Sequence, residues 1–125
     1  MLNTNYDNLT NDILYFFSER IAKARALGIN DIIVDPGFGF SKKLDQNFEL
    51  FNDLELFSFL NTPILIGISR KSMIQKTLNI SATESLNGTT ALHAIALQKG
   101  VSILRVHDVK EAFETISLLQ NLKFH

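Results

Sequence analysis

Hydrophobic positions along the chain follow two spacings, one typical of amphipathic helices and one typical of buried strands. Apolar residues recur every three or four positions in long stretches, which predicts helices over residues 11–27, 44–60, 81–99 and 110–122. Short apolar runs bounded by turn residues predict strands over residues 31–35, 63–68 and 101–106. A short helix is predicted over residues 70–78, after the second strand. Residues 81–84 read Ser-Ala-Thr-Glu, a capping-box pattern that places a helix start there.

The predicted order is α-β-α-β-α-β-α, with the short helix inserted after the second strand. Strict alternation of buried strands and helices is typical of parallel strands joined by right-handed crossovers, so the fold class is α/β. No repeat or linker divides the chain. Three strands are too few to close a barrel, and an open sheet of that size leaves two free edges.

Composition then narrows the function. The chain has 125 residues, 12 basic and 13 acidic side chains, a net charge of -1 and no cysteine. Near-neutral charge argues against nucleic acid or an anionic membrane as a partner. The absence of cysteine excludes disulfides and thiolate metal ligands, and it fits a cytoplasmic protein. The longest apolar run, at 63–68, is too short to span a bilayer.

Polar residues gather where each predicted strand ends, which is where parallel α/β folds bind ligands. The three segments are 35–40 (DPGFGF), 67–72 (GISRKS) and 105–109 (RVHDV). If the strands stay extended and face the same way, four side chains converge on one pocket: Asp35, Lys71, Arg105 and His107. Such a pocket suits a flat heterocycle that carries an anionic group, because it offers one acceptor and several cationic donors.

Each cluster also has a purely structural explanation. Asp35 precedes Pro-Gly and could simply form a turn. The two bases at 70–71 could be solvated residues at the start of a helix. Arg105 and His107 could form a satisfied ion pair with Asp108. Three such clusters at equivalent strand ends nevertheless favour a shared site.

At these clusters the sequence resembles dihydropteroate synthase. The motifs that carry the resemblance occur in the family's order, at residues 35–40, 69–72 and 105–109, and the resemblance extends from about residue 6 to residue 122. It implies a (β/α)8 TIM barrel. It also implies the condensation of 6-hydroxymethyl-7,8-dihydropterin pyrophosphate with p-aminobenzoate, a step of folate biosynthesis that sulfonamides inhibit.

The resemblance also assigns roles at the strand ends. The implied catalytic residues are Lys71, Arg105 and His107. The implied pterin-binding residues are Asp35, Gly67, Lys71 and Arg105, and His107 joins Arg105 at the leaving pyrophosphate. Residues implied to border the p-aminobenzoate site are Phe40, Ser69 and Arg70.

Length separates this chain from a whole barrel, which typically takes about 250 residues. Residues 1–125 are therefore expected to form the C-terminal part of a pterin-binding barrel without the N-terminal strands. In the family those strands carry further pterin ligands and an Asn associated with Mg²⁺. Mg²⁺ is thus implied for the whole enzyme, through that half and the substrate pyrophosphate, and no metal is expected on this chain alone. Little or no turnover by the isolated chain is expected.

Two other functions stay open. The chain could be a non-catalytic fragment that binds a pterin or an anion, or that serves assembly. It could also belong to a pterin-dependent methyltransferase of the same superfamily, although the motifs at 69–72 and 105–109 together favour the synthase. Exposed apolar faces of a partial barrel predict self-association, and a homodimer is expected.

Overall fold

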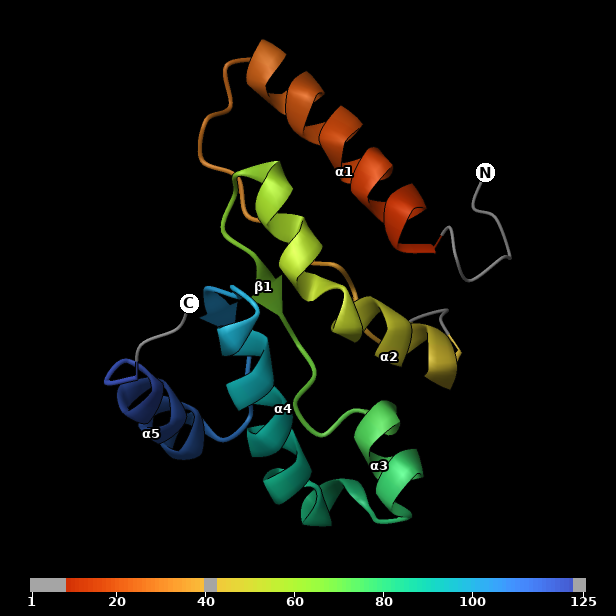
Figure 1. Ribbon diagram of the computed structural model, residues 1–125, viewed down its shortest axis with the longest axis vertical. Helices are drawn as coiled ribbons and strands as arrows, with labels where there is room; N and C mark the ends of the chain where they lie inside the picture. The colour runs from red at the N-terminus through yellow and green to blue at the C-terminus, as the bar shows by residue number, and fades with distance from the viewer. Residues whose placement is uncertain (1–8, 40–42, 123–125) are drawn as a thin grey trace.

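A computed structural model describes residues 9–39 and 43–122. Helix α1 (Leu9–Ala26) lies alongside α2 (Leu44–Asn52) and the 3₁₀ helix η2 (Leu54–Leu60), and α4 (Leu86–Gln98) lies alongside α5 (Val109–Leu119) (Figure 1). The remaining elements are β1 (Leu65–Ile66), α3 (Ser72–Leu78), the 3₁₀ helix η3 (Ala82–Glu84) and β2 (Ile103–Leu104). The order of elements agrees with the prediction, apart from the first strand.

The sheet is parallel, as predicted. Leu65 pairs with Ile103 and Ile66 with Leu104, and one further parallel bridge joins Val34 to Ile64. All three predicted strand segments therefore run side by side in one direction, with β1 in the middle. Their carboxyl ends meet at one edge of the sheet, the arrangement that the prediction of a common site required.

The first predicted strand, at 31–35, is reduced to that single bridge, so the prediction of a full strand was wrong. Val34 donates its N–H to the Pro63 carbonyl and accepts from the N–H of Leu65. On its other side, no described residue pairs with this segment, and the side chain of Ile33 is 56% exposed. The other two strands are shorter than predicted as well: β1 covers only Leu65–Ile66 of the predicted 63–68, and β2 only Ile103–Leu104 of the predicted 101–106.

The predicted helix over 44–60 is two helices that meet at Asp53. The second, η2, is a 3₁₀ helix in which buried apolar residues stand three positions apart. Three residues per turn place Leu54, Phe57 and Leu60 in one row, and all three are buried. The row belongs to the main core, together with Phe38, Leu50, Ile66, Ile68 and Met73.

The capping box predicted at residues 81–84 was also wrong. The hydroxyl of Ser81 bonds to the Glu84 carboxylate instead of a backbone N–H, and residues 82–84 form the single 3₁₀ turn η3. The long helix begins only at Leu86, after Ser85. Ser85 is fully buried and donates its hydroxyl to the Ala82 carbonyl at 2.6 Å, which turns the chain between the two helices.

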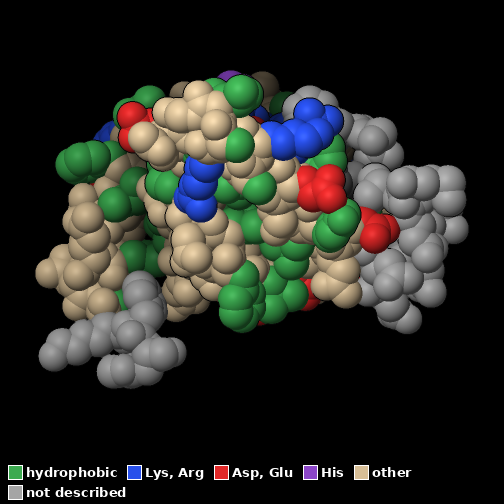
Figure 2. All heavy atoms as spheres, turned by 90° about the horizontal axis from the view of Figure 1, so that it is seen from above, with side chains coloured by type: hydrophobic (Ala, Val, Ile, Leu, Met, Phe, Trp, Pro, Cys, Tyr) green, Lys and Arg blue, Asp and Glu red, His purple; other side chains and the backbone are tan. Residues whose placement is uncertain are grey.

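Hydrophobic side chains reach the surface in several places. Figure 2 shows them between charged side chains on the face seen from above Figure 1. The large exposed apolar residues include Leu27, Ile33 and Phe59, and Val109 and Phe113 on α5. Within the described part of the chain, no helix is long and apolar enough to cross a membrane.

Candidate functional site

Asp35 and Arg105 lie together at the carboxyl edge of the sheet. Nη1 of Arg105 donates to Oδ2 of Asp35 at 2.9 Å, and the two side chains keep 53% and 35% of their surface exposed. The other oxygen, Oδ1, accepts the N–H of Gly37 at 2.9 Å. Asp35 is therefore both a turn former and a partner of the distant Arg105.

Gly67 makes room for that ion pair. Ile66 pairs with Leu104, so the residues that follow them, Gly67 and Arg105, stand level on neighbouring strands. A Cβ atom on Gly67 would lie 2.6 Å from Cζ of Arg105, too close for any real contact. Only a glycine at this position lets the guanidinium cross the strand end toward Asp35.

Lys71 reaches the same edge from the loop after β1. Its backbone caps the start of α3, and its Nζ donates to the Phe38 carbonyl at 2.7 Å. Burial lowers the pKa of the Lys71 ammonium, nearby Arg105 lowers it further, and Asp35 partly offsets both effects. Lys71, Asp35 and Arg105 are thus close enough to act on one another, as the strand-end prediction required.

His107 is joined to Ser69 rather than to the Asp35 group. Nδ1 of His107 and Oγ of Ser69 share a hydrogen bond of 2.9 Å, and the backbone N–H of His107 donates to the same hydroxyl at 3.3 Å. The prediction assumed that the strand stays extended through Lys71, and this assumption was wrong. The strand turns at residues 69–70, where Arg70 has a φ of 56°. Ser69 and Lys71 therefore meet different partners.

Arg70 and Asp108 form a separate ion pair. Nε and Nη2 of Arg70 donate to the two oxygens of Asp108, at 2.9 and 3.0 Å. These hydrogen bonds lower the pKa of the Asp108 carboxyl and raise that of Arg70. The alternative in which Asp108 pairs with Arg105 was therefore wrong, because Arg105 binds Asp35 and Asp108 binds Arg70.

The glycine-rich loop after Asp35 is held by a residue outside the predicted set of site residues. Asn47 on α2 is buried, and its Oδ1 accepts the N–H of Gly39 at 2.9 Å. An amide side chain on the apolar face of a predicted helix was the available signal. Phe40, predicted to border the second substrate, lies outside the described residues.

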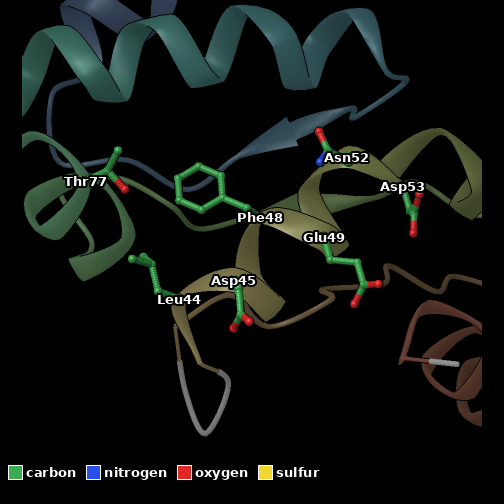
Figure 3. A pocket seen from close by; sticks show the side chains of 7 residues that line it. All are labelled: Leu44, Asp45, Phe48, Glu49, Asn52, Asp53 and Thr77. Carbon is green, nitrogen blue, oxygen red and sulfur yellow. The ribbon is translucent and has the colours of Figure 1, made fainter. Parts of the chain in front are cut away.

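A pocket of the described structure lies away from this edge of the sheet. A hollow of about 630 Å³ between α2 and α3 is lined by Leu44, Asp45, Phe48, Glu49, Asn52, Asp53 and Thr77 (Figure 3). In Figure 3 the carboxylates of Asp45, Glu49 and Asp53 are spread along the helix, whereas Phe48 points toward Thr77. Three carboxylates disfavour an anionic ligand, so this pocket is unsuited to a pyrophosphate.

The described site residues do not fit a divalent metal. Both oxygens of Asp35 already accept hydrogen bonds, and its neighbours Lys71 and Arg105 are cations. Over residues 9–39 and 43–122, no three His, Asp or Glu side chains come together as metal ligands.

Parallel strands with a polar cluster at their carboxyl ends define an α/β protein that binds its ligand at that edge. The family model for pterin binding enzymes matches residues 1–107, and the chain therefore belongs to that family.

Known relatives agree with this assignment. The dihydropteroate synthase of Escherichia coli K12 is 41% identical over 117 residues, which are 92% of this chain and 42% of that enzyme. The Yersinia pestis enzyme with a pterine-sulfa conjugate superposes with a TM-score of 0.88 and 38% identity over 96% of this chain and 48% of that one. The Thermus thermophilus enzyme with 4-aminobenzoate superposes with a TM-score of 0.85. It is 32% identical, and the match covers 90% of this chain and 44% of that one. The chain thus spans less than half the length of these relatives.

Proposed function

We propose that this chain supplies the strand-end residues of a dihydropteroate synthase, in the C-terminal part of a (β/α)8 barrel, and serves folate biosynthesis in the cytoplasm. The observation that carries the proposal is the grouping of Asp35, Lys71 and Arg105 at one sheet edge. An acceptor beside two cations suits a pterin that carries a pyrophosphate. The similarity to synthases over nine-tenths of the chain supports the same reaction.

Binding of the pterin would exchange one partner of Asp35 for another. Its carboxylate accepts the N–H groups of the amino-pyrimidine edge, which releases Arg105 from the ion pair. Arg105 is then free to stack on the ring and to bind the pyrophosphate with His107, while Lys71 donates to the ring. Because the Asp35–Arg105 pair is partly exposed, exchanging it costs little.

The chemistry needs bound charge more than it needs a nucleophile on the protein. The bond between the pterin methylene carbon and the pyrophosphate oxygen breaks, which leaves a resonance-stabilised cation and an anionic leaving group. The amine nitrogen of p-aminobenzoate then forms the new bond and releases a proton. Arg105, His107 and Lys71 stabilise the charge that develops on the leaving group, and the bound geometry places the amine.

The p-aminobenzoate site is assigned to the loops around Ser69, with Phe40 and Arg70 at its border. Complexes of the Thermus thermophilus enzyme with 4-aminobenzoate and of the Yersinia pestis enzyme with a pterine-sulfa conjugate support a site for this ligand class in relatives. Sulfonamides are proposed to bind at the same place. Any Mg²⁺ would be held by the pyrophosphate and by other parts of the whole enzyme, since Asp35 lies beside the two cations Lys71 and Arg105, which repel a metal ion.

Turnover by this chain alone is expected to be weak or absent, because the family's other pterin ligands have no counterpart at these three strand ends. A binding function without turnover is therefore the second candidate, and the partly exposed Asp35–Arg105 pair favours it because a pterin can replace Arg105 on Asp35 at little cost. Methyl transfer is less favoured, since the relatives named above are synthases. A homodimer is proposed from the apolar surface of α5, where the side chain of Phe113 is 69% exposed.

The test is a calorimetric titration of the full chain with 6-hydroxymethylpterin pyrophosphate, followed by an assay for dihydropteroate. We expect saturable binding that Arg105→Ala abolishes and that Arg20→Ala, a control on the exposed face of α1, leaves unchanged. Binding without product supports the second candidate, and binding with product supports the complete reaction. No heat of binding from the folded parent would overturn both.

A further inference from the structure

Arg70 has an unusual backbone for a residue with a side chain. Its φ of 56° lies in the left-handed region, which such residues rarely adopt. Two side chains hold this conformation. The backbone N–H of Arg70 donates to Oγ1 of Thr89 at 3.0 Å, and its carbonyl accepts from Nε2 of Gln75 at 2.7 Å. Thr89 is buried in α4 and donates its own hydroxyl to the Ser85 carbonyl, so its position is fixed as well.

The guanidinium of Arg70 is also held by hydrogen bonds from all three of its nitrogens. Besides its two hydrogen bonds to Asp108, Nη1 donates to the Ala82 carbonyl at 2.6 Å. The side chains of Arg70 and Asp108 keep only 20% and 25% of their surface exposed. A planar guanidinium that is bonded through both its fork and its third nitrogen has a defined orientation, unlike a solvated arginine.

These contacts bring together parts of the chain that are far apart in sequence. Arg70 lies in the loop after β1, and Asp108 lies in the loop after β2, directly before α5. The residues on either side of Arg70 have different partners: Ser69 bonds to His107, and Lys71 bonds to the Phe38 carbonyl. With Arg70 turned toward α4 and η3, its two neighbours are turned toward the strand ends.

We propose that Arg70 and Asp108 act as a positioning pair, which locks the loops after β1 and β2 together and thereby sets the hydrogen bond between Ser69 and His107. The inference deepens the proposed function and rests on it only in so far as Ser69 and His107 serve the substrates. It assigns the guanidinium of Arg70 to the loop instead of to a ligand, so that Arg70 borders the p-aminobenzoate site through its backbone.

The first test uses the free protein and follows the side-chain ¹⁵N and ¹H signals of His107 by NMR. Arg70→Lys keeps the charge but loses the two-pronged contact, and Asp108→Asn keeps the shape but loses the charge. We expect both variants to melt cooperatively and to move the His107 Nδ1 signal toward that of a free histidine. Asp108→Glu, which restores the carboxylate, should recover part of the shift.

Glu111→Gln is the matched control. It removes a carboxylate that acts on Arg70 through its charge alone, so it should leave the His107 signal in place. An unchanged signal in folded Arg70→Lys and Asp108→Asn would overturn the proposal. Loss of folding in both variants would overturn it too, since the pair would then serve stability.

A second measurement separates this inference from the proposed function. Titration with inorganic pyrophosphate should show roughly tenfold weaker binding for Arg70→Lys, which keeps every charge, than for the parent, the scale expected when one hydrogen bond to a charged group is lost. If the parent does not bind pyrophosphate, the proposed function fails, while the NMR result still decides the role of the pair. If the parent binds and Arg70→Lys binds equally well, the positioning role is overturned.

Discussion

Gly67→Ala should weaken ligand binding while leaving the fold intact. The added Cβ would overlap Nη2 of Arg105 most closely and lie 2.6 Å from Cζ and 2.9 Å from Nε, so the guanidinium must move by roughly 1–1.5 Å to reach ordinary contact distance. A shift of that size breaks the 2.9 Å hydrogen bond to Asp35 and displaces the group proposed to bind pyrophosphate. The displaced guanidinium would lose its proposed hydrogen bond to the pyrophosphate. A hydrogen bond to a charged group contributes about 1.5–3 kcal/mol, so affinity should fall roughly 10- to 150-fold.

Stability should hardly change, because two small effects oppose each other. Gly67 does not have a positive φ, so alanine fits the backbone. Alanine also lowers the conformational entropy of the unfolded chain, which stabilises the folded state by about 0.4–1 kcal/mol. The partly exposed ion pair that is lost contributes about 0–1 kcal/mol. Thermal melts of the two proteins should therefore nearly coincide, while calorimetric titration with pyrophosphate separates them.

A double-mutant cycle shows whether Gly67 acts through Arg105. In an Arg105→Ala background the added methyl group meets no guanidinium, so Gly67→Ala should have no further effect on pyrophosphate affinity. An equal loss of affinity in both backgrounds would refute the reasoning. Gly67 would then matter through direct contact with the ligand, which is the role that the family resemblance implied.

Three further predictions concern charge and packing. Burial lowers the pKa of Lys71, so its ammonium loses its proton at a lower pH than an ordinary lysine (pKa about 10.4). Pyrophosphate affinity should therefore fall as the pH rises through that lower range. Lys71→Arg should remove this fall in a series of titrations at different pH. Burial also lowers the pKa of His93, so the folded state takes up its proton less readily. Stability should decrease as the pH falls below about 6.5, and His93→Leu should flatten the melting temperature between pH 7 and 5. Phe57→Ala removes a fully buried ring and should cost about 3–5 kcal/mol in urea unfolding, whereas exposed Phe59→Ala should stay within about 0.5 kcal/mol.

Much of the fold was predictable because hydrophobic spacing reports burial directly. The first helix ends at Ala26 with Gly28 at a φ of 88°, as the pattern indicated, and the three strand segments are parallel and adjacent. The pattern failed where a choice depended on tertiary contacts. The strand at 31–35 is a single bridge at Val34, and residues 82–84 form a 3₁₀ turn before the buried Ser85 instead of the start of the long helix.

The site was predictable as a group of residues but not as a set of pairs. Parallel strand ends bring Asp35, Lys71 and Arg105 together whatever their detailed conformations. Which acid pairs with which base depends on the turn at Arg70, whose left-handed backbone is unexpected for an arginine and depends on Thr89, a residue 19 positions away. No local sequence signal marks such a contact.

The central claim is that a pterin pyrophosphate binds at the carboxyl edge of the sheet, and backbone amide NMR of the full chain tests it most directly. On addition of 6-hydroxymethylpterin pyrophosphate, the signals of Asp35, Gly67 and Arg105 should shift together and saturate. The signals of Asp45 and Glu49, which line the acidic pocket between α2 and α3, should stay in place. Shifts confined to the acidic pocket, or a spectrum of the folded protein that does not change, would contradict the account.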